Sequence, residues 1–462
     1  MGVPSMKPVR IREATHREKR GVKDSFWFLL TAVATFAVLI YIYSSRISLD
    51  IISRLDSAYF ILALYGIIVT PFLLFKFFMA YNYKPVPDKG FRPKLSVIVP
   101  VLNEEKIIAY TLEALLASNY PKDKLEIIVV NDGSTDRTQE IVSRIPQVKL
   151  INHPKNMGKR FAFATGMEHS TGDFLVCVDS DSVVHRNALL YLVQPFADRA
   201  VYCTCGHGNV LNKHKNFLTR FQSVWYSDSF RVTKGLESSL GMVTCCSGVL
   251  ACYRREGIKL VIDDWLNEKF LGRQMLGSDD RRMTNLMLKL HKFAIGSQAD
   301  DRTLTSYAIK TTRSTKSMYQ SNAIVYTAVP DTFRKFFKQQ IRWGRGSFRG
   351  MMFGASFFWR RPLKQSLLFY FLAFVNYLSP FVFFFNLFIL PFVGGLYLAL
   401  AYIGGLVLVN FIKAINVKQL VKNFSLKDVL YRTAFVAMTF PISLIYLYCW
   451  ATVWEGKKWM TR

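Results

Sequence analysis

The chain has 462 residues, of which 51% are hydrophobic and 15% aromatic, which is enough for one large soluble domain and several membrane segments. Lysine and arginine together outnumber aspartate and glutamate by 60 to 32, and such an excess favours nucleic acid, acidic lipid or an anionic substrate as a partner. The sequence has no zinc-ligand spacing and no recognisable nucleic-acid-binding module, and its charges gather beside apolar runs. We therefore expect a membrane protein that binds membrane lipid and no nucleic acid.

The first part of the chain predicts two transmembrane helices. A strongly basic N-terminus precedes two long apolar runs, Phe26–Ser44 and Tyr59–Ala80, each long enough to span a bilayer. The link between them is neutral overall, so the positive-inside rule places the N-terminus and the chain after Ala80 in the cytosol. A cleaved signal peptide is disfavoured, because no small-residue cleavage site follows the first run.

The middle of the chain alternates strand-like and helix-like segments. Leu95–Val101, Leu125–Val130 and Phe174–Val183 are apolar runs of strand length, and the segment from about Glu105 to Ala117 has helical character. Repeated strand–helix units favour a parallel sheet, so we expect one cytosolic α/β domain. The seven cysteines lack metal-ligand spacing and are expected to be reduced thiols.

The last part of the chain predicts an interfacial helix and further membrane segments. Phenylalanines recur on one face of Thr332–Phe358 with lysines and arginines between them, which is typical of a helix lying in the membrane interface, although an ordinary surface helix has the same pattern. Ser366–Leu390 and Phe392–Ile412 are long enough to cross a membrane, and a basic loop follows them.

The final apolar run, Val429–Val453, is interrupted by Pro441 and followed by a basic tail. We expect a re-entrant or interfacial segment here, which gives four crossings and both termini in the cytosol; five crossings is the alternative. The predicted regions are 1–25 (basic N-terminus), 26–83 (two transmembrane helices), 84–331 (cytosolic domain), 332–362 (interfacial helices), 363–428 (two transmembrane helices and a basic loop) and 429–462 (the last segment and basic C-terminus).

Two carboxylates, Asp179 and Asp181, come at the carboxyl end of the third strand-like run, where an open α/β sheet binds its ligands. On an extended backbone residues i and i+2 point the same way, so both carboxylates can face one site. They repel each other unless a cation lies between them or one is protonated. This pattern predicts a Mg²⁺ or Mn²⁺ site that also binds a diphosphate, while an ordinary Asp/Ser turn is the alternative.

Other polar residues follow the strands in the same way. Asn103 and Glu104 come after the first strand, Asp132 after the second, and Lys159 opens a helix-like segment. Loops in these places converge on a nucleotide: a carboxylate suits a base edge or a ribose hydroxyl, and a lysine suits phosphate or a pyrimidine oxygen. Each loop alone is also an ordinary turn or a solvated cation, and the set is specific only when taken in order.

Taken together, the motifs resemble those of family 2 glycosyltransferases, in the processive membrane branch, over about residues 93–345. Within that branch the chain looks most like the hyaluronan synthases, and the nodulation-type chitin-oligomer synthases share much of the pattern. The segments that carry the resemblance are Pro100–Glu104, Asn131–Ser134, Asn156–Arg160, Val178–Asp181, Cys246–Leu250, Ser278–Arg281, Gln339–Trp343 and the C-terminal Trp459–Arg462.

The resemblance implies a GT-A fold, a Rossmann-like nucleotide-sugar-binding domain, embedded in an α-helical transmembrane protein of the plasma membrane with its catalytic domain in the cytosol. It implies a UDP-sugar donor, Mg²⁺ or Mn²⁺, and a growing polysaccharide as acceptor. The roles that it implies are the following: Asp179 and Asp181 hold the metal; Asn103, Glu104, Asp132 and Lys159 bind the nucleotide; Ser247 and Gly248 line the donor pocket; Asp280 is the base, with Arg281 beside it; and Gln339, Gln340, Arg342 and Trp343 line the mouth of the secretion channel.

A second aspartate is also a candidate for the base. The segment around Asp280 is echoed around Asp301, and Ser278 replaces the glycine of the family motif. Spacing from the preceding Phe270-Leu271-Gly272 favours Asp280, whereas spacing to the following Tyr319–Ala323 favours Asp301. We take Asp280 as the base and Asp301 as the alternative.

Three other functions stay open beside a hyaluronan-type polymerase that uses UDP-N-acetylglucosamine and UDP-glucuronic acid. The first is a chitin-type synthase that uses UDP-N-acetylglucosamine alone. The second is an enzyme that makes a single transfer to a lipid carrier, and the third is a non-catalytic membrane adaptor built on an inactive transferase domain.

Overall fold

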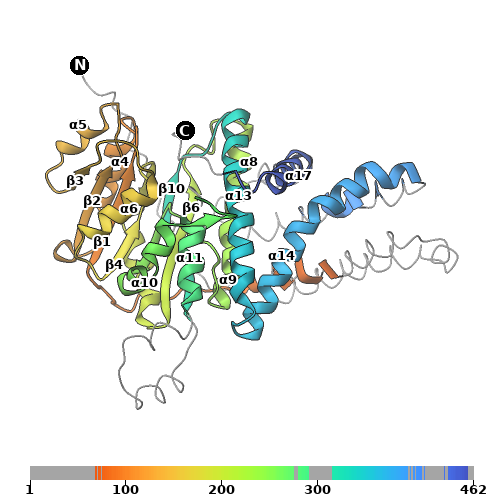
Figure 1. The fold of residues 1–462 in the computed structure, drawn as a ribbon, viewed down its shortest axis with the longest axis horizontal. Coiled ribbons are helices and arrows are strands. Elements are labelled where there is room, and N and C mark those ends of the chain that lie inside the picture. The colour runs from red at the N-terminus through yellow and green to blue at the C-terminus, as the bar shows by residue number, and fades with distance from the viewer. Residues whose placement is uncertain are drawn as a thin grey trace, which may run out of the picture.

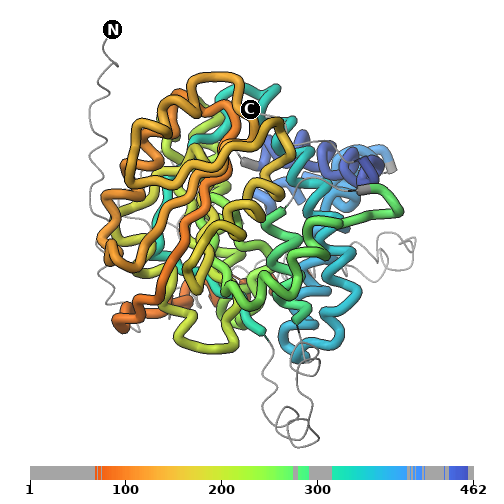
Figure 2. Tube along the Cα trace, turned by 60° about the vertical axis from the view of Figure 1, so that its left-hand side comes forward, coloured from red at the N-terminus to blue at the C-terminus, as the bar shows by residue number. Residues whose placement is uncertain are grey.

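The computed structural model describes residues 78–274, 279–290, 315–393 and 435–455, with shorter pieces within 68–76 and 396–431. These residues form an α/β domain with long helices along one side of it (Figure 1). In Figure 2 the blue C-terminal helices lie on the side of the domain away from the orange strands.

The amino-terminal half of the main sheet is parallel. Its strands are β3 (Lys149–Asn152), β2 (Leu125–Asn131), β1 (Leu95–Val101) and β4 (Phe174–Cys177), in that order across the sheet. β1 pairs in parallel with both β2 and β4, and all seven of its residues are buried. Continuous apolar runs of this kind are what a parallel sheet covered on both faces requires.

The other half of the sheet is mixed. It contains β7 (Ala251–Arg254), β6 (Val201–Val210), β10 (Lys316–Thr327) and β5 (Ser182–Val184). β7 runs antiparallel to both β4 and β6, β10 is parallel to β6, and β5 is antiparallel to β10. The expected parallel sheet is therefore right for β1–β4 and for the β6–β10 pair, and wrong for the pairs that β5 and β7 form. Long helical excursions separate the later strands, and the local pattern of a strand does not specify its direction.

Helices cover both faces of the sheet. One core contains Val97 and Val99 of β1 with Leu112 and Leu189, and the other contains Ile98 of β1. Alternation along the strand sends neighbouring side chains to opposite faces. The first face is covered by α4 (Ile108–Leu116) and α7 (Ala188–Leu192), and the second by α6 (Lys159–Glu168), α10 (Arg255–Leu266) and α11 (Asp279–Lys289); α5 (Thr138–Ser143) follows β2.

A second group of helices packs beside the domain. Between β6 and β7 the chain forms α8 (Phe217–Ser227), a π-helical segment (Asp228–Lys234) and α9 (Gly235–Ser239) without a break. After β10 come α13 (Phe333–Phe358), α14 (Leu363–Phe384) and, beyond residues that are not described, α17 (Phe435–Ala451). α13 begins within one residue of its predicted start, with the Thr332 side chain accepting from the Lys335 N–H as an N-cap.

One helix in the described part of the chain, Leu363–Phe392, is long and apolar enough to cross a membrane, with 30 residues and a mean hydropathy of 1.9 over an 18-residue window. It projects away from the domain in Figure 1. α17 is shorter, and it continues through Pro441. The predicted spans Phe26–Ser44, most of Tyr59–Ala80 and much of Phe392–Ile412 lie outside the described residues, so the number of crossings stays a prediction.

Candidate active site

Asp179 and Asp181 lie in a turn rather than on a strand. β4 ends at Cys177, and the Ser182 N–H donates to the Asp179 carbonyl at 3.0 Å as the chain turns into β5. The prediction of one extended run over Phe174–Val183 is therefore wrong, and with it the argument that an extended backbone aligns the two side chains. Both carboxylates nevertheless stay at the carboxyl edge of β4, where the Asp181 residue is only 5% exposed.

Lys159 lies between two acidic side chains that come from distant parts of the chain. Its ammonium donates to Asp179 Oδ1 at 2.5 Å and lies 3.9 Å from Asp280 Oδ1. Burial alone lowers the pKa of Lys159, but the two carboxylates outweigh burial and raise it above the usual lysine range. The structure thus brings together three of the predicted site residues, with the Lys159 ammonium between the carboxylates of Asp179 and Asp280.

Asp280, in the first turn of α11, has two different neighbours. Lys159 attracts one of its oxygens, and the Gly248 N–H donates to the other, Oδ2, at 2.8 Å. Burial is the largest influence on the Asp280 carboxyl and raises its pKa, while Lys159 acts in the opposite direction. A carboxylate with a raised pKa, fixed by a backbone N–H, suits a general base.

Gly248 is a glycine for a steric reason. A Cβ at this position would lie 2.7 Å from Asp280 Oδ1 and 2.7 Å from the Lys159 Nζ. The backbone therefore approaches both charged groups more closely than any side chain allows. Ser247, next to it, accepts a hydrogen bond at 2.6 Å from Lys234.

A buried arginine, which sequence reasoning missed, fixes the start of α11. Arg160 is 2% exposed and binds Asp279 at 2.8 Å and Glu268 at 2.9 Å. Its guanidinium also donates to the Trp265 carbonyl at 2.5 Å. Arg160 thus orients the helix that carries Asp280, and the one signal for it in the sequence is its place directly after Lys159.

Asp132 is fully buried and its carboxylate binds the chain itself. It accepts from the Met157 N–H at 2.9 Å and the Gly158 N–H at 2.8 Å, and it lies 2.9 Å from the His153 Nδ1. The tight turn that follows depends on Gly133, which has φ +75°, and a Cβ there would lie 2.6 Å from the Lys155 carbonyl carbon. Asp132 therefore shapes the loop that leads into Lys159.

Asn103 and Glu104 connect the first loop to the second. Asn103 has a left-handed φ of 53°, and its side-chain oxygen accepts from the Thr135 N–H at 2.7 Å. The Glu104 N–H donates to the Thr138 hydroxyl at 2.9 Å. The predicted nucleotide loops thus lie side by side at the carboxyl edge of β1 and β2.

The Gln339–Trp343 motif lies in the second and third turns of α13. Gln339 and Gln340 are buried, whereas Arg342 and Trp343 are exposed, Trp343 at 39%. The Trp343 ring lies 6.3 Å from that of Tyr226, in α8.

Arg281, next to Asp280, connects the base to α13. Its guanidinium donates to the Thr244 hydroxyl at 3.3 Å, and its side chain packs against Gly350, two helical turns after Trp343. One helix, α13, therefore carries the exposed Trp343 and also contacts Arg281, the residue beside the proposed base.

The donor set at Asp179 and Asp181 fits a metal that the substrate helps to bind. Across the described ranges no group of three or more His, Cys, Asp or Glu side chains could hold a metal ion by itself. Mg²⁺ at phosphate-transfer sites typically has one or two carboxylates, phosphate oxygens and water as ligands, so two aspartates and a diphosphate suffice. The alternative base, Asp301, lies outside the described residues, as does Ser278.

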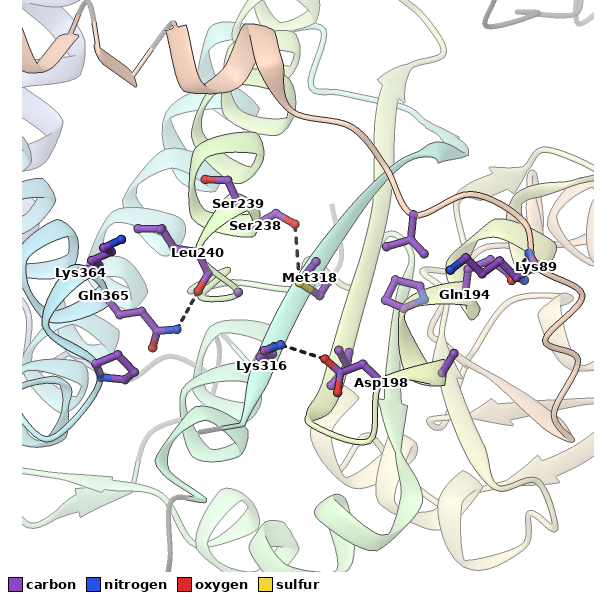
Figure 3. Close-up of a pocket in the computed structure, with 16 residues that line it drawn as sticks. Lys89, Gln194, Asp198, Ser238, Ser239, Leu240, Lys316, Met318, Lys364 and Gln365 are labelled. Atoms are coloured by element: carbon purple, nitrogen blue, oxygen red, sulfur yellow. Dashed lines mark hydrogen bonds and ion pairs between the residues drawn. The ribbon is translucent and has the colours of Figure 1, made fainter. Parts of the chain in front are cut away.

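A cavity of about 530 Å³ lies elsewhere, between the domain and the start of α14 (Figure 3). Lys89, Lys316, Met318 and Lys364 contribute to its lining, and Lys316 forms an ion pair with Asp198 at 2.8 Å. None of the predicted site residues lines this cavity.

Comparison with known proteins gives consistent matches. Residues 96–261 match the model for Glycosyl transferase family 2. Hyaluronan synthase from Streptococcus pyogenes is 35% identical over 296 residues, which cover 62% of this chain and 64% of that protein. N-acetylglucosaminyltransferase from Rhizobium meliloti (strain 1021) is 32% identical over 263 residues, 56% of each chain. The matched part thus spans somewhat less than two thirds of these relatives.

Among solved structures, the mannosyltransferase PcManGT from Pyrobaculum calidifontis, in complex with GDP-Man and Mn²⁺, has a TM-score of 0.51. It is 20% identical, and the superposition covers 84% of this chain and 99% of that one, so it supports the fold alone. The mixed sheet with helices on both faces is accordingly a GT-A-like glycosyltransferase fold. The chain therefore contains a domain of glycosyl transferase family 2, and over 62% of its length it is similar to a hyaluronan synthase.

Proposed function

We propose that this protein is a processive membrane glycosyltransferase that polymerises sugars from UDP-sugar donors and moves the polysaccharide across the plasma membrane. The donors of a hyaluronan-type synthase, UDP-N-acetylglucosamine and UDP-glucuronic acid, are the proposed pair. The observation that carries the proposal is the Asp280 carboxylate, which Lys159 and the Gly248 N–H hold beside Asp179 of the family 2 domain.

The reaction is a displacement at the anomeric carbon of the donor sugar. A hydroxyl of the acceptor attacks this carbon, Asp280 takes the hydroxyl proton, and the bond to UDP breaks with its electron pair leaving on the diphosphate. Attack opposite the leaving group inverts the anomeric centre. A divalent cation bound by Asp179 and Asp181 would stabilise the negative charge of the departing UDP.

Lys159 has two tasks in this scheme. Its ammonium holds Asp179 and attracts Asp280 before the donor binds. An approaching diphosphate offers it a stronger partner, and a shift of Lys159 toward phosphate would leave Asp280 freer to accept a proton.

Asp132 contributes to nucleotide binding through the loop that it shapes. Direct contact between Asp132 and uridine requires the surrounding loop to open, because this carboxylate is fully buried. In the arrangement described above, Asp132 instead fixes the loop that presents Lys159, and Asn103 and Glu104 complete the same edge.

The proposal that the protein is embedded in the membrane and exports its product is based on the helices beside the domain. Leu363–Phe392 meets the length and hydropathy needed for a span, and the exposed Trp343 lies on the helix that precedes it. An indole face stacks on the C–H face of a sugar, so Trp343 is placed to hold the acceptor at the mouth of a channel. This arrangement supports a cytosolic catalytic domain that delivers its product into the membrane region.

A chitin-type synthase is the second candidate, because the N-acetylglucosaminyltransferases are nearly as similar to this chain as the hyaluronan synthases. The test uses purified membranes, labelled UDP-N-acetylglucosamine and Mg²⁺ or Mn²⁺, with and without UDP-glucuronic acid. A long product that needs both donors and is digested by hyaluronidase supports the proposal. A product from the single donor that chitinase digests selects the second candidate, and absence of any UDP release from either donor contradicts both.

A further inference from the structure

The loop that carries Gly248 is connected to the helix of Asp280 at three points. Arg281 donates to the Thr244 hydroxyl at 3.3 Å, the Cys246 N–H donates to the Thr284 hydroxyl at 2.9 Å, and the Gly248 N–H donates to Asp280 Oδ2 at 2.8 Å. The hydrogen bond from Gly248 orients the Asp280 carboxylate. Its geometry is kept only if the loop does not move relative to α11.

The opposite side of this loop is held by two charged residues from the helical stretch 228–239. Glu237 accepts from the Thr244 hydroxyl at 2.8 Å, and the Lys234 ammonium donates to the Ser247 hydroxyl at 2.6 Å. Ser247 directly precedes Gly248, so the Lys234 bond lies one residue from the N–H that reaches Asp280.

Lys234 has an unusual environment for a lysine. It is 7% exposed, and its other contacts are the Cys205 sulfur at 3.8 Å and the face of the Phe230 ring, 4.2 Å from its centroid. Within the part of the chain that the structure describes, no carboxylate oxygen lies within 4.0 Å of its Nζ. A cation–π contact offsets part of the desolvation, but the hydroxyl and the thiol are weak partners for a buried ammonium.

Glu237, buried three residues further along the chain, attracts the Lys234 ammonium and offsets part of its desolvation, so fold stability gives only part of the reason for a lysine here. An apolar side chain of similar volume is often as stable as a buried charge, or more so, and Phe230 and Cys205 would accommodate it. Lys234 is also the last residue of the π-helical segment Asp228–Lys234, and such segments are frequent at functional sites. A role in the reaction explains both features.

We propose that Lys234 is a positioning residue for the transfer step: through Ser247 it holds the Gly248 N–H against the Asp280 carboxylate. This inference rests on the proposed function, since it presumes that Asp280 is the base. Lys234 itself lies behind the loop and contacts neither Lys159 nor Asp179, so its loss should change turnover and leave nucleotide binding intact. A displacement of the base by about 1 Å lowers the rate on the order of 10²-fold.

The experiment measures kcat for UDP release and, separately, the Kd of UDP by titration calorimetry, using the full-length protein in detergent or nanodiscs. We expect Lys234→Met to lower kcat about 10²-fold with the Kd of UDP unchanged within about twofold. Lys234→Arg should recover part of the rate, because a guanidinium can still donate to Ser247. Lys316→Met is the matched control, since it removes a lysine that pairs with Asp198 away from the site, and it should turn over normally.

Ser247→Ala keeps the test decisive if Lys234→Met folds poorly. Ser247→Ala should reproduce the loss of kcat, and the double variant should be no worse than Lys234→Met alone, because both substitutions break the same link. Normal turnover in Ser247→Ala, or a loss of UDP affinity equal to the loss of kcat in Lys234→Met, would overturn the inference while leaving the proposed function intact. A wild-type protein that releases no UDP overturns the proposed function and this inference with it.

Discussion

Replacing Gly248 with alanine perturbs the proposed base with one added methyl group. The new Cβ would lie 2.7 Å from both Asp280 Oδ1 and the Lys159 Nζ, whereas ordinary contacts begin at 3.4 Å, so these groups must retreat by about 0.7 Å. Both atoms are the ends of flexible side chains, and Gly248 does not have a positive φ. The fold can therefore accept the change, but the carboxylate and the ammonium have to move.

A displacement of this size at a reacting group costs on the order of 10²-fold in rate, which is about 2.7 kcal/mol in activation free energy. Gly248→Ala should therefore lower kcat for UDP release about 10²-fold. Its effect on the free energy of unfolding should stay within about 1 kcal/mol, because alanine also restricts the unfolded chain.

The assay follows UDP release with both donors and Mn²⁺, together with the melting temperature and the Kd of UDP. Gly405→Ala is the matched control, since a Cβ there meets nothing within 4 Å, and it should behave as wild type. Wild-type kcat in Gly248→Ala would refute the placement of Asp280 and Lys159 at the reacting centre.

Three further predictions concern the metal ligand Asp181, Arg160 at the start of α11, and Trp343 at the proposed channel mouth. Asp181→Asn should remove the dependence of UDP release on Mn²⁺ together with nearly all turnover, while the protein still folds; retained metal-dependent release would remove the metal assignment. Arg160→Met removes the cation that binds the half-buried Asp279 and leaves the buried Glu268 with Arg282 alone, 3.6 Å away, so it should destabilise the protein by about 3 kcal/mol, which a thermal melt would show as a clear fall in melting temperature; an unchanged melt would contradict the role of this arginine. Trp343→Ala should shorten the polysaccharide on a gel more than it lowers UDP release, whereas Trp359→Ala, which alters an exposed indole at the end of α13, should leave product length unchanged.

The local sequence pattern correctly predicted the bounds of those strands and helices that do not depend on distant contacts. β1 has its predicted bounds, β2 ends one residue later, and α13 starts one residue later. Buried parallel strands appear as short apolar runs, and α13 combines helical periodicity with a threonine cap, so neither depends on distant contacts.

The prediction over Phe174–Val183 was wrong because an apolar run does not show where a chain turns. The turn at Asp179–Asp181 separates β4 from β5, and β5 pairs with β10, whose sequence lies more than 130 residues away. The mixed half of the sheet has the same origin, since strand direction there depends on the intervening helices.

The site residues that sequence reasoning missed act through contacts that are distant in sequence. Arg160 meets Asp279 across 119 positions, and Lys234 supports a loop whose effect reaches Asp280 through a backbone N–H. Sequence motifs identified Lys159, Asp179 and Asp280 as candidates, but only the fold shows that one ammonium contacts both carboxylates.

The central claim is that Asp280 is the base of a sugar-transfer reaction, and the most direct test compares Asp280→Asn with Asp301→Asn for UDP release under saturating donors and Mn²⁺. A general base contributes on the order of 10²–10⁴-fold, so Asp280→Asn should lose at least 10²-fold in kcat with the Kd of UDP unchanged, and Asp301→Asn should stay within a few-fold of wild type. An Asp280→Asn protein with near-normal turnover, beside an inactive Asp301→Asn protein, would contradict the assignment and move the reacting centre to the other acidic segment.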